Sequence, residues 1–270
     1  MKYVVDHDFH IHSCLSACSR DEEQTPERLL EYAKANGYRR IVVTDHFWDE
    51  GVAGASPWYA PQNYDHVRKS LPLPTAEGVE FLFGVETEMT AWNTVAITRE
   101  RCEDFAFVIV PVSHFHMVGF SLSKEEAATA EGRAEKFFAK LEVLLQMDLP
   151  FSKIGLAHLA NDTMGGGDNA MYCRVMGLIL SQRERLERIF TRVAELGAGV
   201  ELNIYSLNFQ TKEEEEAVKR FYSVAKACGC KFYFGSDAHH PADFEGKRAI
   251  AEHFVDLLGL EEFDKYHIAK

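Results

Sequence analysis

The sequence lacks long apolar runs, and their absence argues against a membrane protein. No stretch approaches the roughly 20 consecutive apolar residues that a membrane-spanning helix needs. The opening residues, MKYVVDHDFH, contain no apolar run of the length found in a signal peptide. We therefore expect a protein that does not enter the membrane and that resides in the cytoplasm.

Basic residues are also scarce. Lysine and arginine number 29 against 42 aspartate and glutamate residues, which gives a formal net charge of −13. A protein that coats nucleic acid or an anionic membrane surface usually has the opposite balance. We therefore expect neither nucleic acid nor a membrane as a partner, while small-molecule substrates remain compatible with this charge.

The chain has few cysteines and no segment with the composition of a linker between domains. Its six cysteines are scattered over 270 residues, which disfavours a disulfide framework. No tract rich in proline, glycine or serine marks a boundary, and 46% hydrophobic residues allow a sizeable core. Because α/β barrels commonly reach this length as one unit, we expect residues 1–270 to form a single domain.

Two common catalytic motifs are missing as well. The phosphate-binding pattern G-x-x-x-x-G-K-[ST] is absent, and GGGD at 165–168 lacks the lysine, so we interpret it as a flexible loop. No G-x-S-x-G pattern occurs, and a serine nucleophile therefore has no support. The residues that are present indicate a different chemistry.

Short apolar runs alternate with amphipathic segments along the chain. TPERLLEYAKANGY predicts a helix, because Thr25 can cap it and Pro26 suits its first position. Further helices are expected at 124–147, 182–196 and 212–228. Seven strands are predicted at DFHIH, RRIVVTDHF, EFLFGVE, FAFVIVPVSH, SKIGLAH, AGVELNI and KFYFGSDAH. This alternation predicts an α/β fold with a parallel sheet, either open and doubly wound or closed into a barrel.

Polar residues at the strand ends favour the barrel. Each predicted strand has a candidate metal ligand at or just past its carboxyl end: His10 and His12, His46, Glu86, His114, His158, Glu201, then Asp237 with His239. Strand alternation would place His10 and His12 on one face, with Phe9 and Ile11 on the other. An open sheet would hold its outer strand ends too far apart to share a site, whereas a barrel brings them to one face.

The candidate ligands suit metal-assisted hydrolysis. Neutral imidazole binds zinc, iron, nickel and copper well, and one tetrahedral zinc ion takes about four ligands. Six histidines with Glu86 and Asp237 exceed that number, so two or three divalent ions are indicated, and Glu86 can bridge two of them. A pair of ions about 3.5–4 Å apart activates water and clamps the oxygens of a phosphoryl group. Phosphate-ester hydrolysis is therefore the expected chemistry.

The ordered motifs DFHIH, TDH, GVE, SH, AH and GSDAH resemble the polymerase and histidinol phosphatase (PHP) superfamily, from about Val4 to His239. The resemblance implies a distorted (β/α)7 TIM-like barrel that holds two or three Zn, Fe or Mn ions. It also implies a phosphatase for a small phosphomonoester, with histidinol phosphate as one candidate substrate. A metal-bridged hydroxide would then attack phosphorus without a protein nucleophile.

The resemblance also implies a set of ligands and catalytic residues. Glu86 and Asp237 would be catalytic through the metals that they hold, and Glu201 would not need to touch metal. The first ion would be held by His10, His12, Glu86 and Asp237. The second would be held by Glu86, His114 and His158, and the third by His46 and His239.

A further ligand to the third ion is expected from the loop after His12. This loop, SCLSACSRDEE, offers either Cys18 or Asp21. We favour Asp21, because an exposed thiolate is prone to oxidation and a hydrolytic site gains from an exchangeable oxygen ligand.

Other polar residues are candidates for supporting roles. His116 would share a strand face with His114 and could touch the substrate, although a solvent-facing or core histidine is an equal alternative. Arg20 and Arg174 are expected in loops after the first and fifth strands, where each either binds phosphate or is a solvated surface arginine. Asp8 and Asp45 precede ligand histidines, and either orient them or lie in solvent.

Two alternative functions remain open. An amidohydrolase also begins with H-x-H on a barrel strand, but it usually has eight strands and often a carboxylated lysine bridge, and no lysine follows a strand here. The second alternative is a catalytically idle metal-binding module.

Overall fold

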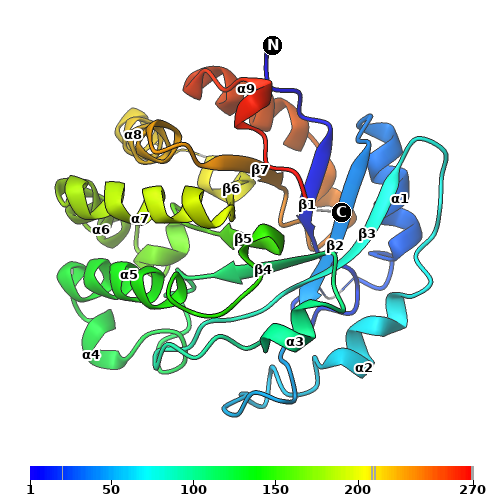
Figure 1. Cartoon of the computed structure of the whole chain (residues 1–270), viewed down its shortest axis with the longest axis horizontal. Helices are drawn as coiled ribbons and strands as arrows, with labels where there is room; N and C mark the ends of the chain where they lie inside the picture. The colour runs from blue at the N-terminus through cyan, green and yellow to red at the C-terminus, as the bar shows by residue number, and fades with distance from the viewer. Residues whose placement is uncertain (20, 208, 210, 269–270) are drawn as a thin grey trace.

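The strands form a parallel sheet that follows the order of the sequence. The computed structural model describes residues 1–19, 21–207, 209 and 211–268, so Arg20 lies outside the described residues. The seven strands are β1 (His7–Ile11), β2 (Arg40–His46), β3 (Glu80–Glu86), β4 (Phe107–Pro111), β5 (Ile154–Ala157), β6 (Gly199–Asn203) and β7 (Lys231–Gly235). Ile11 pairs with Ala238 just beyond β7, so the sheet is nearly closed (Figure 1). The predicted distorted (β/α)7 barrel is confirmed.

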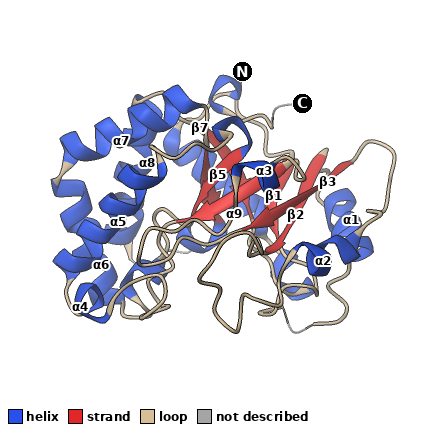
Figure 2. Cartoon of the chain, turned by 60° about the horizontal axis from the view of Figure 1, so that its bottom comes forward, coloured by secondary structure: helices blue, strands red, loops and turns tan. Residues whose placement is uncertain are grey.

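Helices surround this sheet on its outer side, as Figure 2 shows. They are α1 (Pro26–Ala35), α2 (Tyr64–Val67), α3 (Arg99–Cys102), α4 (Lys124–Ala127), α5 (Ala130–Leu144), α6 (Asn169–Ser181), α7 (Arg183–Leu196), α8 (Lys212–Ala227) and α9 (Lys247–Leu258). In both views α5, α6, α7 and α8 pack together on one side of the barrel. Within the described part of the chain, none of the helices combines the length and apolarity needed to cross a membrane.

Local capping explains where the helices begin. Thr25 accepts a hydrogen bond from the Arg28 amide and Pro26 opens α1, as predicted. The single helix predicted at 124–147 is wrong, because Thr129 is extended and caps a new helix through the Gly132 amide. The helices predicted at 182–196 and 212–228 are confirmed as α7 and α8.

Helix α6 was not predicted, and it changes the position of Arg174. Asp168 caps this helix by accepting a hydrogen bond from the Met171 amide, and its residues at helical spacing, such as Tyr172 and Val175, are buried. Arg174 therefore lies on the exposed side of a helix, and its expected position in a loop is wrong. The aspartate before an apolar periodic segment was the signal that would have identified α6.

The interior of the barrel is filled by side chains from the strands, together with Tyr266 and Ile268 from the C-terminal segment. One buried cluster receives no helical residue and consists of Phe9, Val42, Phe107, Ile109, Ala157, Tyr233, Tyr266 and Ile268. Ile11 belongs instead to the large cluster that includes the helices. The prediction that Phe9 and Ile11 lie on the same face of the strand is wrong, because the register of β1 shifts between Asp8 and Ile11.

We predict that Gly155→Ala destabilises the barrel. A Cβ added at Gly155 would overlap Phe107 and would lie 2.5 Å from the Tyr233 hydroxyl oxygen. Overpacking of this kind typically costs about 1–3 kcal/mol. Gly177→Ala is the control, because that glycine lies within α6 and faces open space, so alanine should stabilise by roughly 0.5–1 kcal/mol. Urea unfolding measures both, and an unchanged midpoint for Gly155→Ala would contradict the tight interior.

Candidate metal centre

The carboxyl ends of the strands bring the predicted ligands to one face of the barrel. The residues gathered there are His10, His12, His46, Glu86, His114, His158, Asp237 and His239. His158 and Asp237, just past β5 and β7, have φ values of 61° and 53°. This left-handed conformation is uncommon for residues other than glycine, although Asn, Asp and His adopt it more often than the rest, and such backbone conformations often accompany a functional site.

The measured spacings within the first candidate group are close to those expected around one zinc ion. The Nε2 atoms of His10 and His12 are 3.1 Å apart. Glu86 Oε2 lies 3.6 and 3.4 Å from these two nitrogens, and Asp237 Oδ1 lies 3.4 and 3.2 Å from them. Ligands at about 2.0–2.1 Å from one zinc ion would be about 3.3 Å from each other in a tetrahedron.

The second group uses the other oxygens of the same carboxylates. Glu86 Oε1 lies 3.7 Å from His114 Nε2 and 3.5 Å from His158 Nε2. Asp237 Oδ2 lies 3.3 Å from His158 Nε2. Glu86 therefore directs one oxygen to each of two neighbouring groups, which is the arrangement that a bridging carboxylate requires.

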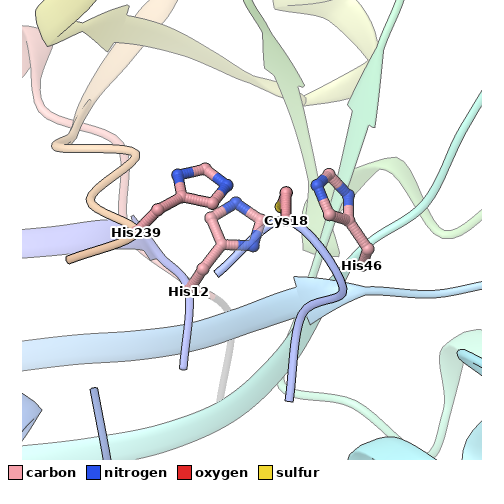
Figure 3. Close-up of side chains that lie close together, drawn as sticks. All are labelled: His12, Cys18, His46 and His239. Carbon is pink, nitrogen blue, oxygen red and sulfur yellow. The ribbon is translucent and has the colours of Figure 1, made fainter. Parts of the chain in front are cut away.

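The third group contains a thiol. Ligand atoms of His12, Cys18, His46 and His239 all lie within 4.8 Å of one another, and Figure 3 shows the four side chains gathered together. Burial raises the pKa of Cys18, but hydrogen bonds to His239 and His46 outweigh it and lower the pKa to about 7.

Asp21, which we favoured over Cys18, lies elsewhere. Its Oδ2 atom is 2.6 Å from Nε2 of His240, outside the ligand cluster. The preference for Asp21 is therefore wrong in this geometry, because Cys18 occupies the position beside His46 and His239.

Hydrogen bonds at Nδ1 fix the orientation of most ligand histidines. Four rings have Nδ1 against an oxygen: His10 with Glu201 Oε1 at 2.6 Å, His12 with Ser16 Oγ at 2.8 Å, His114 with Glu88 Oε2 at 2.8 Å, and His239 with the Asp237 carbonyl at 2.8 Å. Contacts of this kind are typical of metal-binding histidines, because they fix the tautomer and leave the lone pair of Nε2 available to a metal ion.

Unpaired buried atoms test whether the cluster fits metal ions. Among the described residues, the buried side-chain atoms without a well-aligned hydrogen bond include both Glu86 oxygens and His158 Nε2, although histidine nitrogens lie 3.0 to 3.7 Å from those oxygens. Each such atom costs about 1–3 kcal/mol when it is left unsatisfied, and more when it is charged. Divalent cations among them would supply the missing partners, so the residues fit a metal cluster.

The two central carboxylates are ionised. Burial alone would raise the pKa of Glu86, but His46 and His10 hold it well below the usual value. Asp237 is buried as well, and His10 and His158 lower its pKa in the same way. Two buried negative charges at the centre of a histidine cluster favour the binding of cations.

Sequence reasoning missed two orienting residues. Glu88 contacts His114 and also accepts hydrogen bonds from the Tyr59 hydroxyl at 3.1 Å and the Met89 amide at 2.8 Å. Its position two residues after Glu86 was a usable signal, since alternate residues share a face. Ser16 contacts His12, but nothing in its sequence context distinguished it from the other serines of the loop.

The three acidic residues considered for supporting roles differ in what they touch. Glu201 contacts the His10 ring and accepts a hydrogen bond from the His158 amide. Asp45 accepts a hydrogen bond from Ser16, through which it reaches the His12 ring. Asp8 instead accepts hydrogen bonds from backbone amides, including those of His10 and Ser236.

A cavity of about 530 Å³ adjoins the ligands. Besides candidate ligands, the walls of the cavity include Trp58, Tyr59, His116, Met117 and Asp162. His116 therefore lies where a substrate could touch it, whereas Arg174 does not line the cavity. No lysine or arginine from the described part of the chain contributes to these walls.

Comparisons with known proteins identify the fold. No protein-family model matches the chain, and no curated protein matches its sequence. Histidinol phosphate phosphatase from Lactococcus lactis subsp. lactis, solved with zinc, L-histidinol and phosphate, has a TM-score of 0.62 at 17% identity and covers 97% of this chain and 99% of its own. A candidate histidinol phosphatase from Listeria monocytogenes has a TM-score of 0.56 at 13% identity, and the match covers 89% of this chain and 97% of the Listeria chain. The chain therefore has an α/β barrel fold like that of histidinol phosphatase structures, which agrees with the resemblance in its motifs.

We predict that Glu88→Gln weakens metal binding, because the amide cannot match the charge of the carboxylate beside His114 Nδ1. Loss of such an orienting partner typically lowers metal affinity by about 10–100-fold. Glu80→Gln is the matched control, since Glu80 begins the same strand and pairs with Arg40 instead. Competition with a chromogenic chelator measures zinc affinity, and equal affinities for wild type and Glu88→Gln would refute the orienting role.

Proposed function

We propose that this chain is a metal-dependent phosphatase that hydrolyses a small phosphomonoester at a di- or trinuclear site. The observation that carries the proposal is the position of Glu86, whose two oxygens face two separate groups of nitrogen ligands. Two cations held on either side of one carboxylate would activate a water and bind the oxygens of a phosphoryl group.

The solved relative supports the substrate class. The Lactococcus protein was solved with zinc, L-histidinol and phosphate, and its fold covers nearly all of this chain. Histidinol phosphate is therefore the first substrate to test. The low sequence identity leaves other phosphomonoesters in the same class.

The residues of the chain divide the work of the proposed reaction. Glu86 and Asp237 each present both oxygens to the ligand groups, and would thereby hold neighbouring cations at a fixed separation. Glu88 and Glu201 keep the rings of His114 and His10 directed at those cations. The chain itself thus positions the ions and the phosphoryl group, and no side-chain nucleophile is needed.

The cavity walls indicate the kind of alcohol that leaves. Among the described residues, no lysine or arginine lines the cavity, so the cations would be the main source of positive charge for the phosphate there. Trp58 and Met117 offer apolar contact, and Asp162 adds a carboxylate for which the structure shows no ion pair among the described residues. These walls favour an apolar or cationic leaving group, which agrees with the amine of histidinol.

A screen of phosphomonoesters with zinc- or manganese-loaded protein tests the function. We expect turnover of at least one substrate, and kcat/KM should fall by at least about two orders of magnitude in Glu86→Gln, which keeps the shape but removes the bridging charge. Glu80→Gln should retain activity. Full metal content without turnover of any phosphomonoester would instead support an idle metal-binding module.

We further predict that Asp162→Asn raises KM selectively for phosphomonoesters that carry an amine. Asp162 is exposed at the cavity, so its attraction for a cation is worth under about 1 kcal/mol, or roughly a two- to fivefold change in KM. A neutral aryl phosphate should be unaffected by the same substitution. Equal changes for the two substrates would show that Asp162 does not recognise the amine.

A further inference from the structure

Cys18 is held over the cavity by its neighbours in the loop. The Ala17 amide donates a hydrogen bond to Gln62 Oε1 at 2.9 Å, and the Ser19 hydroxyl donates one to the His239 carbonyl at 2.7 Å. The residues on both sides of Cys18 are thus tied to different parts of the barrel. The thiol itself lines the cavity together with His46 and His239.

His12 belongs to the inner group rather than to this outer one. Its Nδ1 contacts Ser16, so Nε2 is its free donor, and that atom lies 3.2 Å from Asp237 Oδ1 and 3.4 Å from Glu86 Oε2. Three side chains remain for an outer ion, namely Cys18, His46 and His239. A site with three protein ligands keeps a fourth position open, as catalytic zinc sites do.

We infer that Cys18 supplies a thiolate ligand to an outer metal ion, together with His46 and His239, and thereby makes that position selective for zinc over manganese. The inference rests on the metal cluster of the proposed function and adds a ligand of a different chemical class to it. The inner groups offer only imidazole and carboxylate, which accept zinc, iron or manganese. Thiolate is a soft ligand that favours zinc and disfavours manganese, so the outer position would differ from the inner ones in the metal it takes.

The geometry disfavours the carboxylate that could have taken the same role. Asp21 pairs with His240 at 2.6 Å, and Cys18 instead lies within reach of His46 and His239. The remaining alternative is a Cys18 sulfur that only forms hydrogen bonds with the two histidines. A thiol of that kind would not bond to a metal, and spectroscopy distinguishes the two cases.

Cobalt substitution tests the bond directly. Purified protein is stripped with a chelator and loaded with Co²⁺, and the near-ultraviolet thiolate-to-cobalt charge-transfer absorption is recorded. We expect this band in the wild type and its loss in Cys18→Ser. Cys14→Ser is the matched control, because Cys14 lies in the same loop but outside the ligand group. The Cys14→Ser protein should therefore retain the cobalt band. A wild-type protein without the band, or a band that persists in Cys18→Ser, would overturn the inference.

Alkylation provides a second readout that needs no variant. Cys18 and Cys173 are both exposed, and Cys173 lies on α6, away from the ligands. With iodoacetamide, zinc should slow modification of Cys18 by at least about tenfold, because a bound thiolate is no longer a free nucleophile, and should leave Cys173 unchanged. Mass spectrometry of the two peptides gives both rates. Equal modification of Cys18 with and without zinc would overturn the inference.

Metal selectivity is tested with Cys18→Asp, which replaces the soft ligand by a hard one. When zinc and manganese are supplied together, the variant should take a larger share of manganese than the wild type. An unchanged ratio would overturn the proposed selectivity. These measurements do not depend on turnover: a cobalt band in a protein that hydrolyses no phosphomonoester would refute the proposed function and leave the thiolate ligand standing.

Discussion

The buried carboxylate of Glu86 is the constraint on which the rest of the site depends. It is fully buried and ionised, and its two oxygens lie 3.0 Å from His46 Nδ1 and 3.5 Å from His158 Nε2. An isolated carboxylate in such a place would cost several kcal/mol, so its surroundings must supply positive charge. Burial lowers the pKa values of His10 and His46, but the facing carboxylates outweigh it and raise both well above the usual value. The cluster therefore sets positive charge against buried negative charge, and in the proposed site cations would supply that positive charge.

The barrel solves the problem of bringing ligands from distant parts of the sequence to Glu86. Parallel strands that follow one another around a nearly closed sheet place all their carboxyl ends on one face, so each strand need contribute only one or two side chains. His158 and Asp237 take positive φ values just past β5 and β7, and both face the cluster.

The sequence allowed the seven strands and the choice of a barrel to be predicted, because polar residues ended every apolar run. It did not reveal the details that depend on local irregularities. A register shift in β1 separates Phe9 from Ile11, and a capping threonine at position 129 divides one expected helix into two. In the site, Ser16 was missed because its orienting contact depends on three-dimensional proximity, whereas Glu88 was missed although its position two residues after Glu86 was a usable signal.

The loop after β1 shows why the choice between Cys18 and Asp21 required the structure. Both residues had suitable chemistry and both follow His12 at short range. Ser16 is fixed by Asp45 and His12, Ala17 by Gln62, and Ser19 by the His239 carbonyl, so the loop turns Cys18 toward the cavity. Asp21 follows after that turn and meets His240 instead. The hydrogen bonds of residues that bind no metal thus decide which of two competent side chains faces the ligand cluster.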